Sequence, residues 1–167
     1  MEQAKQYPQP EYQQNKLIEI IKQTARNELY TSHLYWSLTL NKLTKKIPFL
    51  SGMANKAYKE DKLHFLTLTN HCHSLKAHMR QNEHNNTTLP VKSNMHVQNL
   101  QKQSISFLIE ELKVAESQSI YFQQRICSMT LEHDYQTFDI VYSLLNENIE
   151  HENNLTSLLS EQIDKNI

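Results

Sequence analysis

Apolar side chains recur along most of this chain at intervals of three and four residues, the spacing that is typical of amphipathic helices. The pattern predicts a first helix over about Glu11–Lys45 and a second that begins at Pro48 and ends near Arg80. It predicts a third helix over about His96–Met129 and a fourth over about Asp134–Asp164. The sequence therefore indicates an all-α protein with four long helices.

The connections between these helices differ in length. Residues 1–10 are polar and contain two prolines, so we expect an N-terminal arm outside a domain that covers residues 11–164. Tight connections near Pro48 and over Thr130–His133 predict two antiparallel helix pairs. The stretch Asn82–Asn94 could span ~43–47 Å when extended, about the length of one of these helices. A four-helix bundle with one long crossover between helices two and three is predicted, with a plain up-and-down bundle as the alternative.

The composition excludes several classes of protein. A single glycine in 167 residues is too few for the glycine-rich loops that bind nucleotide phosphates. The formal net charge is −1 with no basic stripe, so no nucleic-acid partner is expected. No apolar run approaches the ~20 residues of a membrane span. Cys72 and Cys127 form no metal or redox spacing, and we expect a cytoplasmic protein with reduced thiols.

Acidic and histidine side chains recur on the expected inward faces of three helices. Asp61 and His64 lie one helical turn apart, close enough to hold one metal ion together. Glu28 and His151 could join them from the first and fourth helices. Burying unpaired carboxylates costs several kcal/mol, which a bound cation offsets. The apolar neighbours expected on the same inward stripe are Leu34, Leu63 and Leu145.

A solvated polar face is the alternative to a metal site, because a carboxylate and a histidine at this spacing also arise by chance among nine histidines. The other histidines of the second helix are expected to face solvent or to lie on its polar face: His71, His73 and His78.

These residues lie in motifs that resemble the bacterioferritins and non-haem bacterial ferritins. Asn27-Glu28-Leu29, followed by Tyr35-Trp36, is similar to the first helix of that family. Asp61 follows Glu28 by 33 positions, the separation of the first two iron carboxylates in the family, and Asp61-x-x-His64 is similar to its Glu-x-x-His. The resemblance covers most of residues 16–163 and is weakest in the third helix. In the fourth helix it rests on Asp134, Tyr135, Asp139, Leu145, His151 and Leu155.

The resemblance implies a ferritin-like bundle with a di-iron centre in which two ferrous ions each give one electron to dioxygen or peroxide. Ferritins use this ferroxidase step to load stored iron. Tyr35 would be a redox-active side chain, unless it is simply a core aromatic. The implied ligands are Glu28, Asp61, His64, Asn148 and His151, with either Glu116 or Glu111 from the third helix. The carboxylates implied to bind or pass on iron outside the centre are Glu60, Glu147 and Glu150.

Four positions depart from the family pattern. Asp61 stands where the family has a longer glutamate, and Asn148 stands where bacterioferritins have a bridging glutamate, so we expect weaker binding of the iron near His151. An ungapped register of the third helix would bring Lys113 near the site, which would favour an inactive centre. Lys62 takes the place of the haem methionine, so no haem is expected.

Three functions are compatible with these features. The first is a ferritin-like protein that oxidises or stores iron as a homo-oligomer, either a dimer or a cage. The second is a di-iron oxidoreductase of the rubrerythrin or hydroxylase kind, which acts on a small substrate or peroxide. The third is a metal-free helical scaffold whose site has degenerated.

Overall fold

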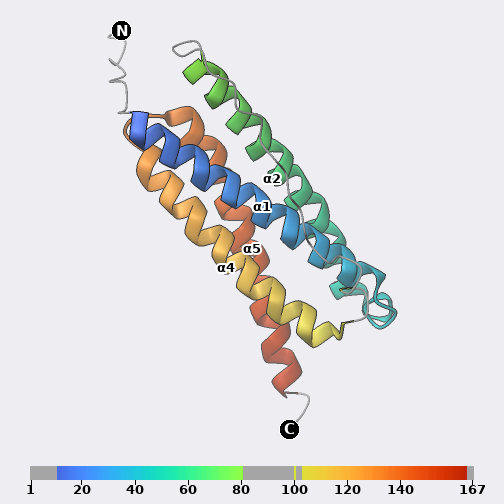
Figure 1. Cartoon of the computed structure of the whole chain (residues 1–167). Helices are drawn as coiled ribbons and strands as arrows, with labels where there is room; N and C mark the ends of the chain where they lie inside the picture. Colours follow the sequence, from blue (N-terminus) through green and yellow to red (C-terminus); the bar gives the residue numbers. More distant parts are fainter. Residues whose placement is uncertain (1–10, 81–99, 101–102, 165–167) are drawn as a thin grey trace.

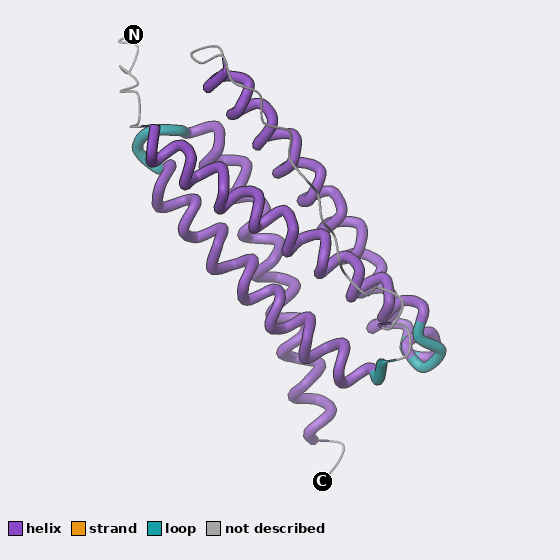
Figure 2. The backbone as a smooth tube through the Cα atoms, in the orientation of Figure 1, coloured by secondary structure: helices purple, strands orange, loops and turns teal. Residues whose placement is uncertain are grey.

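The computed structural model describes residues 11–80, 100 and 103–164 of the chain. Within them lie four α-helices and a short 3-10 helix, η1, over Thr44–Lys46, and no strand (Figures 1 and 2). The helices are α1 over Glu11–Leu40, α2 over Pro48–Arg80, α4 over Ile105–Thr130 and α5 over Tyr135–Asp164. The prediction of an all-α protein with four long helices is confirmed for this part of the chain.

Two predicted helix bounds are wrong. The first helix ends at Leu40 and not at Lys45, because Asn41 Oδ1 accepts from the backbone N–H of Leu43 (2.9 Å) and turns the chain into η1. The third begins at Ile105 and not at His96. Its N-cap is Ser104, whose hydroxyl accepts from the backbone N–H of Phe107 (3.1 Å).

The helices form two pairs that pack side by side. Helix α1 packs against α2 and α4, and α4 packs against α5. In Figure 1, α2 and α4 run toward the same end of the bundle, while α1 and α5 run the opposite way. The predicted crossover over Asn82–Asn94 and the arm over residues 1–10 both lie outside the described residues. The path that joins α2 to α4 therefore stays a prediction.

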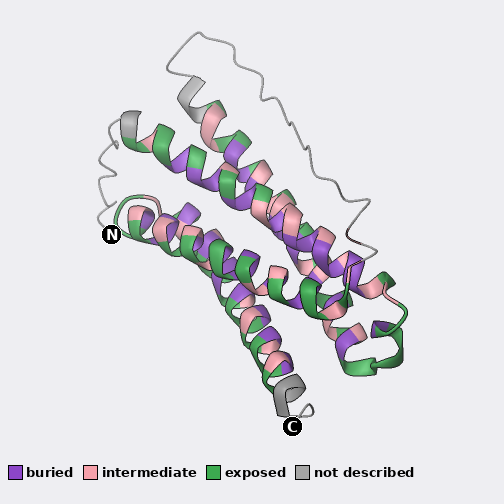
Figure 3. Cartoon of the chain, turned by 60° about the horizontal axis from the view of Figure 1, so that its bottom comes forward, coloured by how far each residue is buried: buried purple, intermediate pink, exposed green. Residues whose placement is uncertain are grey.

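The interior consists of two apolar clusters separated by a polar layer. One cluster lies near the start of α1 and includes Ile21, Leu68, Ile126 and Val141. The other lies near the end of α1 and includes the following fully buried side chains: Leu34, Leu38, Leu50, Leu108, Leu112 and Leu155. Five buried acidic and histidine residues fall between these two clusters: Glu28, Asp61, His64, Glu116 and His151. Figure 3 shows the buried face of each helix turned inward. The polar layer is thus held from both sides by packed side chains.

Leu63 does not belong to the inward stripe. Its side chain is 61% exposed, whereas Leu34 and Leu145 are buried as predicted. The reason is the helical period, since Leu63 lies about 200° around α2 from Asp61 and the two side chains cannot share a face.

The prediction that His71 faces solvent is wrong, because its side chain is buried. Its Nε2 lies 2.7 Å from Thr137 Oγ1. Thr137 is in turn hydrogen-bonded through its backbone N–H to Asp134 Oδ1 (3.0 Å), so His71 contacts the capped start of α5. His73 is exposed as predicted, and the side chain of His78 lies outside the described residues. Among the described helices, none combines the length and apolar character needed to cross a bilayer.

Candidate metal centre

The polar layer gathers acidic and histidine side chains from all four helices. Glu28 comes from α1, Asp61 and His64 from α2, Glu116 from α4 and His151 from α5, and all five are buried. They form two groups whose ligand atoms lie within 4.8 Å of one another. The first group is Glu28, Asp61 and His64, and the second is Asp61, Glu116 and His151. Asp61 belongs to both groups, so its two oxygens could serve two metal ions.

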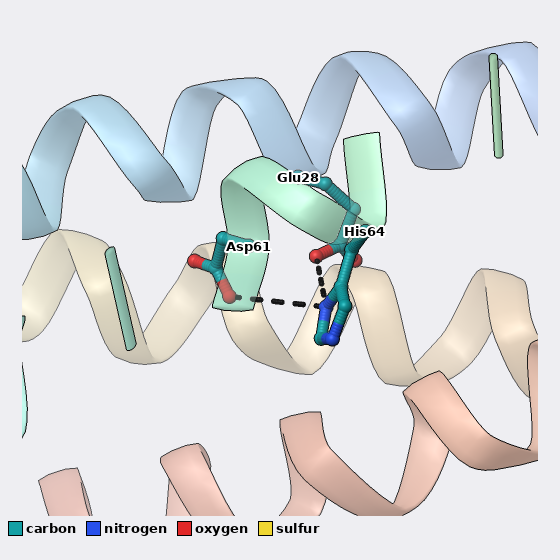
Figure 4. A group of neighbouring side chains, drawn as sticks. All are labelled: Glu28, Asp61 and His64. Atoms are coloured by element: carbon teal, nitrogen blue, oxygen red, sulfur yellow. Dashed lines mark hydrogen bonds and ion pairs between the residues drawn. The ribbon is translucent and has the colours of Figure 1, made fainter. Parts of the chain in front are cut away.

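The first group is centred on the Nδ1 atom of His64 (Figure 4). Nδ1 lies 3.1 Å from Glu28 Oε2 and 4.0 Å from Asp61 Oδ1. Asp61 and His64 are one turn apart on α2, and Glu28 reaches them from the adjacent α1, as Figure 4 shows. Two carboxylates and one imidazole nitrogen therefore converge on one point.

The second group is centred on the Nδ1 atom of His151. Nδ1 lies 3.2 Å from Glu116 Oε1 and 3.4 Å from Asp61 Oδ1. At these distances the atoms can form ion pairs, but their directions make no hydrogen bond, so Nδ1 has no hydrogen-bond partner. The arrangement again joins two carboxylates to one imidazole nitrogen.

Each histidine turns its other ring nitrogen to a carboxylate on the opposite helix. His64 Nε2 lies 3.1 Å from Glu147 Oε2, and His151 Nε2 lies 3.0 Å from Glu60 Oε2. Once a metal ion had displaced the Nδ1 proton, a carboxylate at Nε2 would keep the remaining proton on Nε2 and leave the Nδ1 lone pair toward the centre. Glu60 and Glu147 thus orient the two histidines.

This exchange reflects a repeat that the sequence analysis missed. Glu60-Asp61-x-x-His64 on α2 matches Glu147-Asn148-x-x-His151 on α5 in spacing, and in each copy the glutamate contacts the histidine of the other copy. A search for internal similarity would have found the repeat. Only the packing of α2 opposite α5 shows that the glutamate of each copy contacts the histidine of the other.

Glu28 is also held by two amide side chains. Its Oε1 accepts from Asn148 Nδ2 at 2.8 Å and from Gln123 Nε2 at 3.2 Å. Both amides are fully buried. The sequence analysis did not single out Gln123, because a glutamine in a polar helix carries no signal until its neighbours are known.

Other predicted site residues lie apart from the two groups. The ambiguity in the third helix is resolved geometrically, since Glu116 lies in the centre and Glu111 accepts from Tyr30 OH at 3.2 Å. Lys113 is partly exposed and lines a surface groove with Val114, and so does not enter the centre. Glu150 is exposed and pairs with Lys56 at 2.9 Å.

Tyr35 contacts the second group. Its hydroxyl donates to Glu116 Oε1 (2.9 Å), and its ring lies edge-on to His151 with centroids 5.8 Å apart. Burial and the charges of Glu116, Asp61 and Glu28 raise the pKa of Tyr35 well above its usual value. The phenol therefore stays protonated and fixes one oxygen of Glu116.

Burial and neighbouring charges together leave four pKa values in the metal-free centre above their ordinary values. Burial raises the pKa of Asp61 to about 6, and burial together with the charge of Asp61 raises that of Glu116 to about 8. Burial lowers the pKa of both histidines, but neighbouring carboxylates outweigh it. Contact with Glu28 raises the pKa of His64 to about 9, and contact with Asp61 and Glu116 raises that of His151 to about 11. A metal ion would therefore have to displace protons.

The donor set fits a divalent metal ion. Both oxygens of Asp61, Oε2 of Glu116 and Nδ1 of His151 are buried without a hydrogen-bond partner. Buried acceptors without partners cost free energy, and cation coordination is one of the few ways to offset that cost. Carboxylate oxygen and imidazole nitrogen together suit ferrous iron, manganese or zinc.

We expect the metal-free protein to lose stability as pH rises. The four groups hold protons more tightly in the folded chain than in the unfolded chain. Their stabilisation is therefore full below the ordinary pKa values and is lost as pH rises through the folded values. Between pH 6 and pH 9 the free energy of unfolding should fall by more than about 1 kcal/mol. This lower bound is smaller than the roughly 1.4 kcal/mol by which the uptake of a single extra proton changes stability over one pH unit. Urea unfolding at several pH values, with a chelator present, measures this change in the free energy of unfolding.

The matched control for this pH dependence is Glu116→Gln, which removes one of the shifted groups and should flatten the curve between about pH 5 and 8. A free energy of unfolding that is constant or rises over this range would contradict the expected proton uptake.

Comparisons of the chain with models of protein families, with curated proteins and with solved structures found no match. The class that the fold and the site define is an all-helical protein with buried carboxylate and histidine groups that could hold a metal ion.

Proposed function

We propose that this protein is a ferritin-like di-iron protein that binds and oxidises ferrous iron. The observation that carries the proposal is Asp61, a buried carboxylate without hydrogen-bond partners that is shared by two carboxylate–histidine groups. Inward carboxylates and histidines from all four helices of a bundle are the arrangement of di-iron carboxylate proteins. The parallel course of α2 and α4 in Figure 1 supports the long crossover of that fold.

The residues that would hold the two ions have distinct roles. Glu28 and His64 would bind one ion, Glu116 and His151 the other, and Asp61 both. Bound ferrous ions would supply electrons to dioxygen or peroxide. The chain itself orients the ligands, because Tyr35 fixes Glu116 and the two outer glutamates fix the histidines. The apolar clusters close the centre at both ends.

The cellular compartment and the oligomeric state of the protein are also part of the proposal. Cys72 and Cys127 are free and buried, which favours the reducing conditions of the cytoplasm. Exposed Leu63 and Leu66 on the outer face of α2 favour a homo-oligomer. Sedimentation would separate a cage, which supports storage, from a dimer, which does not.

The direct test is anaerobic binding of ferrous iron by the metal-free chain. We expect at most about two tight ions per chain, followed by oxidation when oxygen is admitted. The double variant Asp61→Ala with His64→Ala should lose most of the binding, whereas His73→Ala, on an exposed position of the same helix, should not. Iron stoichiometry that is unchanged in the double variant would refute the site.

A metal-free scaffold is the second candidate, and one specific observation favours it. Glu28 already has partners for both oxygens, as expected of a carboxylate that is stable without a metal ion. If iron, zinc and manganese all leave the melting temperature unchanged, the scaffold is the better description. Oxygen consumption that depends on an added organic substrate would instead identify an oxidoreductase.

A further inference from the structure

The two halves of the centre differ in how far their ligand atoms are already engaged. In the half built from Asp61, Glu116 and His151, each residue presents a buried atom without a hydrogen-bond partner. These atoms are both oxygens of Asp61, Oε2 of Glu116 and Nδ1 of His151. An incoming cation would break no hydrogen bond at these atoms, and it would replace the ion pairs of His151 Nδ1 with Glu116 Oε1 (3.2 Å) and Asp61 Oδ1 (3.4 Å).

The half that contains Glu28 is closed by hydrogen bonds. Glu28 Oε1 accepts from Asn148 and Gln123, and Oε2 lies 3.1 Å from His64 Nδ1. A carboxylate oxygen only accepts, so both amides must turn their NH2 groups toward it. Their own oxygens are left buried without a donor. We call Gln123 and Asn148 the amide clamp.

We propose that the centre fills in a fixed order, with the first divalent cation at Asp61, Glu116 and His151 and the second, more weakly held, at Glu28 and His64. This inference rests on the proposed function. The clamp competes for the lone pairs of Glu28, and the loss of one hydrogen bond to a charged group corresponds to at least about tenfold in affinity.

This order is the reverse of the one expected from the sequence alone. The spacing of Asn148 and His151 suggested that the missing carboxylate weakens the site near His151. In the fold, the amide nitrogen of Asn148 lies 2.8 Å from Glu28 Oε1, so its effect falls on the half that contains His64. The clamp makes Gln123 a positioning residue that sets the affinity difference between the two halves.

The experiment is an anaerobic titration of the metal-free full chain with Co²⁺, followed by calorimetry and by visible absorption. We expect two events whose affinities differ by at least about tenfold. His151→Ala should remove the tighter event, and His64→Ala only the weaker. Gln123→Leu should strengthen the weaker event at least about tenfold and leave the tighter one unchanged, because one competing hydrogen bond to a charged group is gone. Gln118→Leu, exposed on the same helix, is the control.

A second measurement uses the unaltered protein and does not depend on the folding of any variant. In a Zn²⁺ titration followed by NMR of the imidazole groups, the His151 signals should shift during the first equivalent and the His64 signals during the second. Equal affinities, a first shift at His64, or a weaker second event in Gln123→Leu would overturn the fixed order and leave the metal function standing. Absence of any Co²⁺ or Zn²⁺ binding would overturn both.

Discussion

Replacing Asp61 by asparagine is expected to abolish tight binding at both metal positions while the chain stays folded. Loss of a residue that only supports a metal ligand already costs 10- to 100-fold in affinity. Loss of the ligand shared by both groups should therefore cost at least about a hundredfold at each position. The metal-free variant should stay folded, since asparagine keeps the shape of the side chain and neither oxygen of Asp61 accepts a hydrogen bond, while the 3.4 Å ion pair with His151 Nδ1 is lost.

The readout for Asp61→Asn is the stabilisation that metal produces. At a hundredfold excess over the dissociation constant, the unaltered chain should gain about 2.7 kcal/mol, and the variant almost none. Asp139→Asn makes the same change at an exposed position of α5 and should behave as the unaltered protein. A variant that still gains the full stabilisation would show that Asp61 is not the shared ligand.

Replacing Asn148 by glutamate is expected to have opposite effects on the metal-free and metal-bound protein. Without metal, the change puts an unpaired buried charge beside Glu28 and should cost about 3–5 kcal/mol of stability, or roughly 6–20 °C in melting temperature. With metal, a fourth carboxylate balances the charge of two divalent ions. The second ion should then bind more tightly, and oxidation of a few ferrous ions per chain should be faster.

The measurements for Asn148→Glu are melting with and without Zn²⁺ and stopped-flow oxidation with ferrous iron. Asn153→Glu adds the same charge at an exposed position of α5 and should change neither. If Asn148→Glu destabilises the metal-free chain but metal fails to restore it, Asn148 would face a part of the core where no cation binds.

The sequence by itself determined the helices and most of the residues that meet in the centre. The period of apolar residues specified α2 to within its observed bounds, because every turn of an amphipathic helix repeats the same signal. The prediction failed at Leu40, where the first helix ends because the side-chain oxygen of Asn41 accepts a hydrogen bond from the backbone N–H of Leu43. Glu28, Asp61, His64 and His151 could be proposed together because acidic and histidine residues recur on the inward faces of the helices at a spacing that resembles that of the bacterioferritins.

Only the tertiary structure decided how these residues are partnered. Which of Glu116 and Glu111 enters the centre depends on the rotation of α4 against its neighbours, and the family resemblance was weakest in this helix. The exchange of glutamates between α2 and α5 and the amide clamp on Glu28 join residues that lie 83 to 120 positions apart. Hydrogen bonds are short and directional, so the sequence pattern can place such groups on a face but cannot choose their partners.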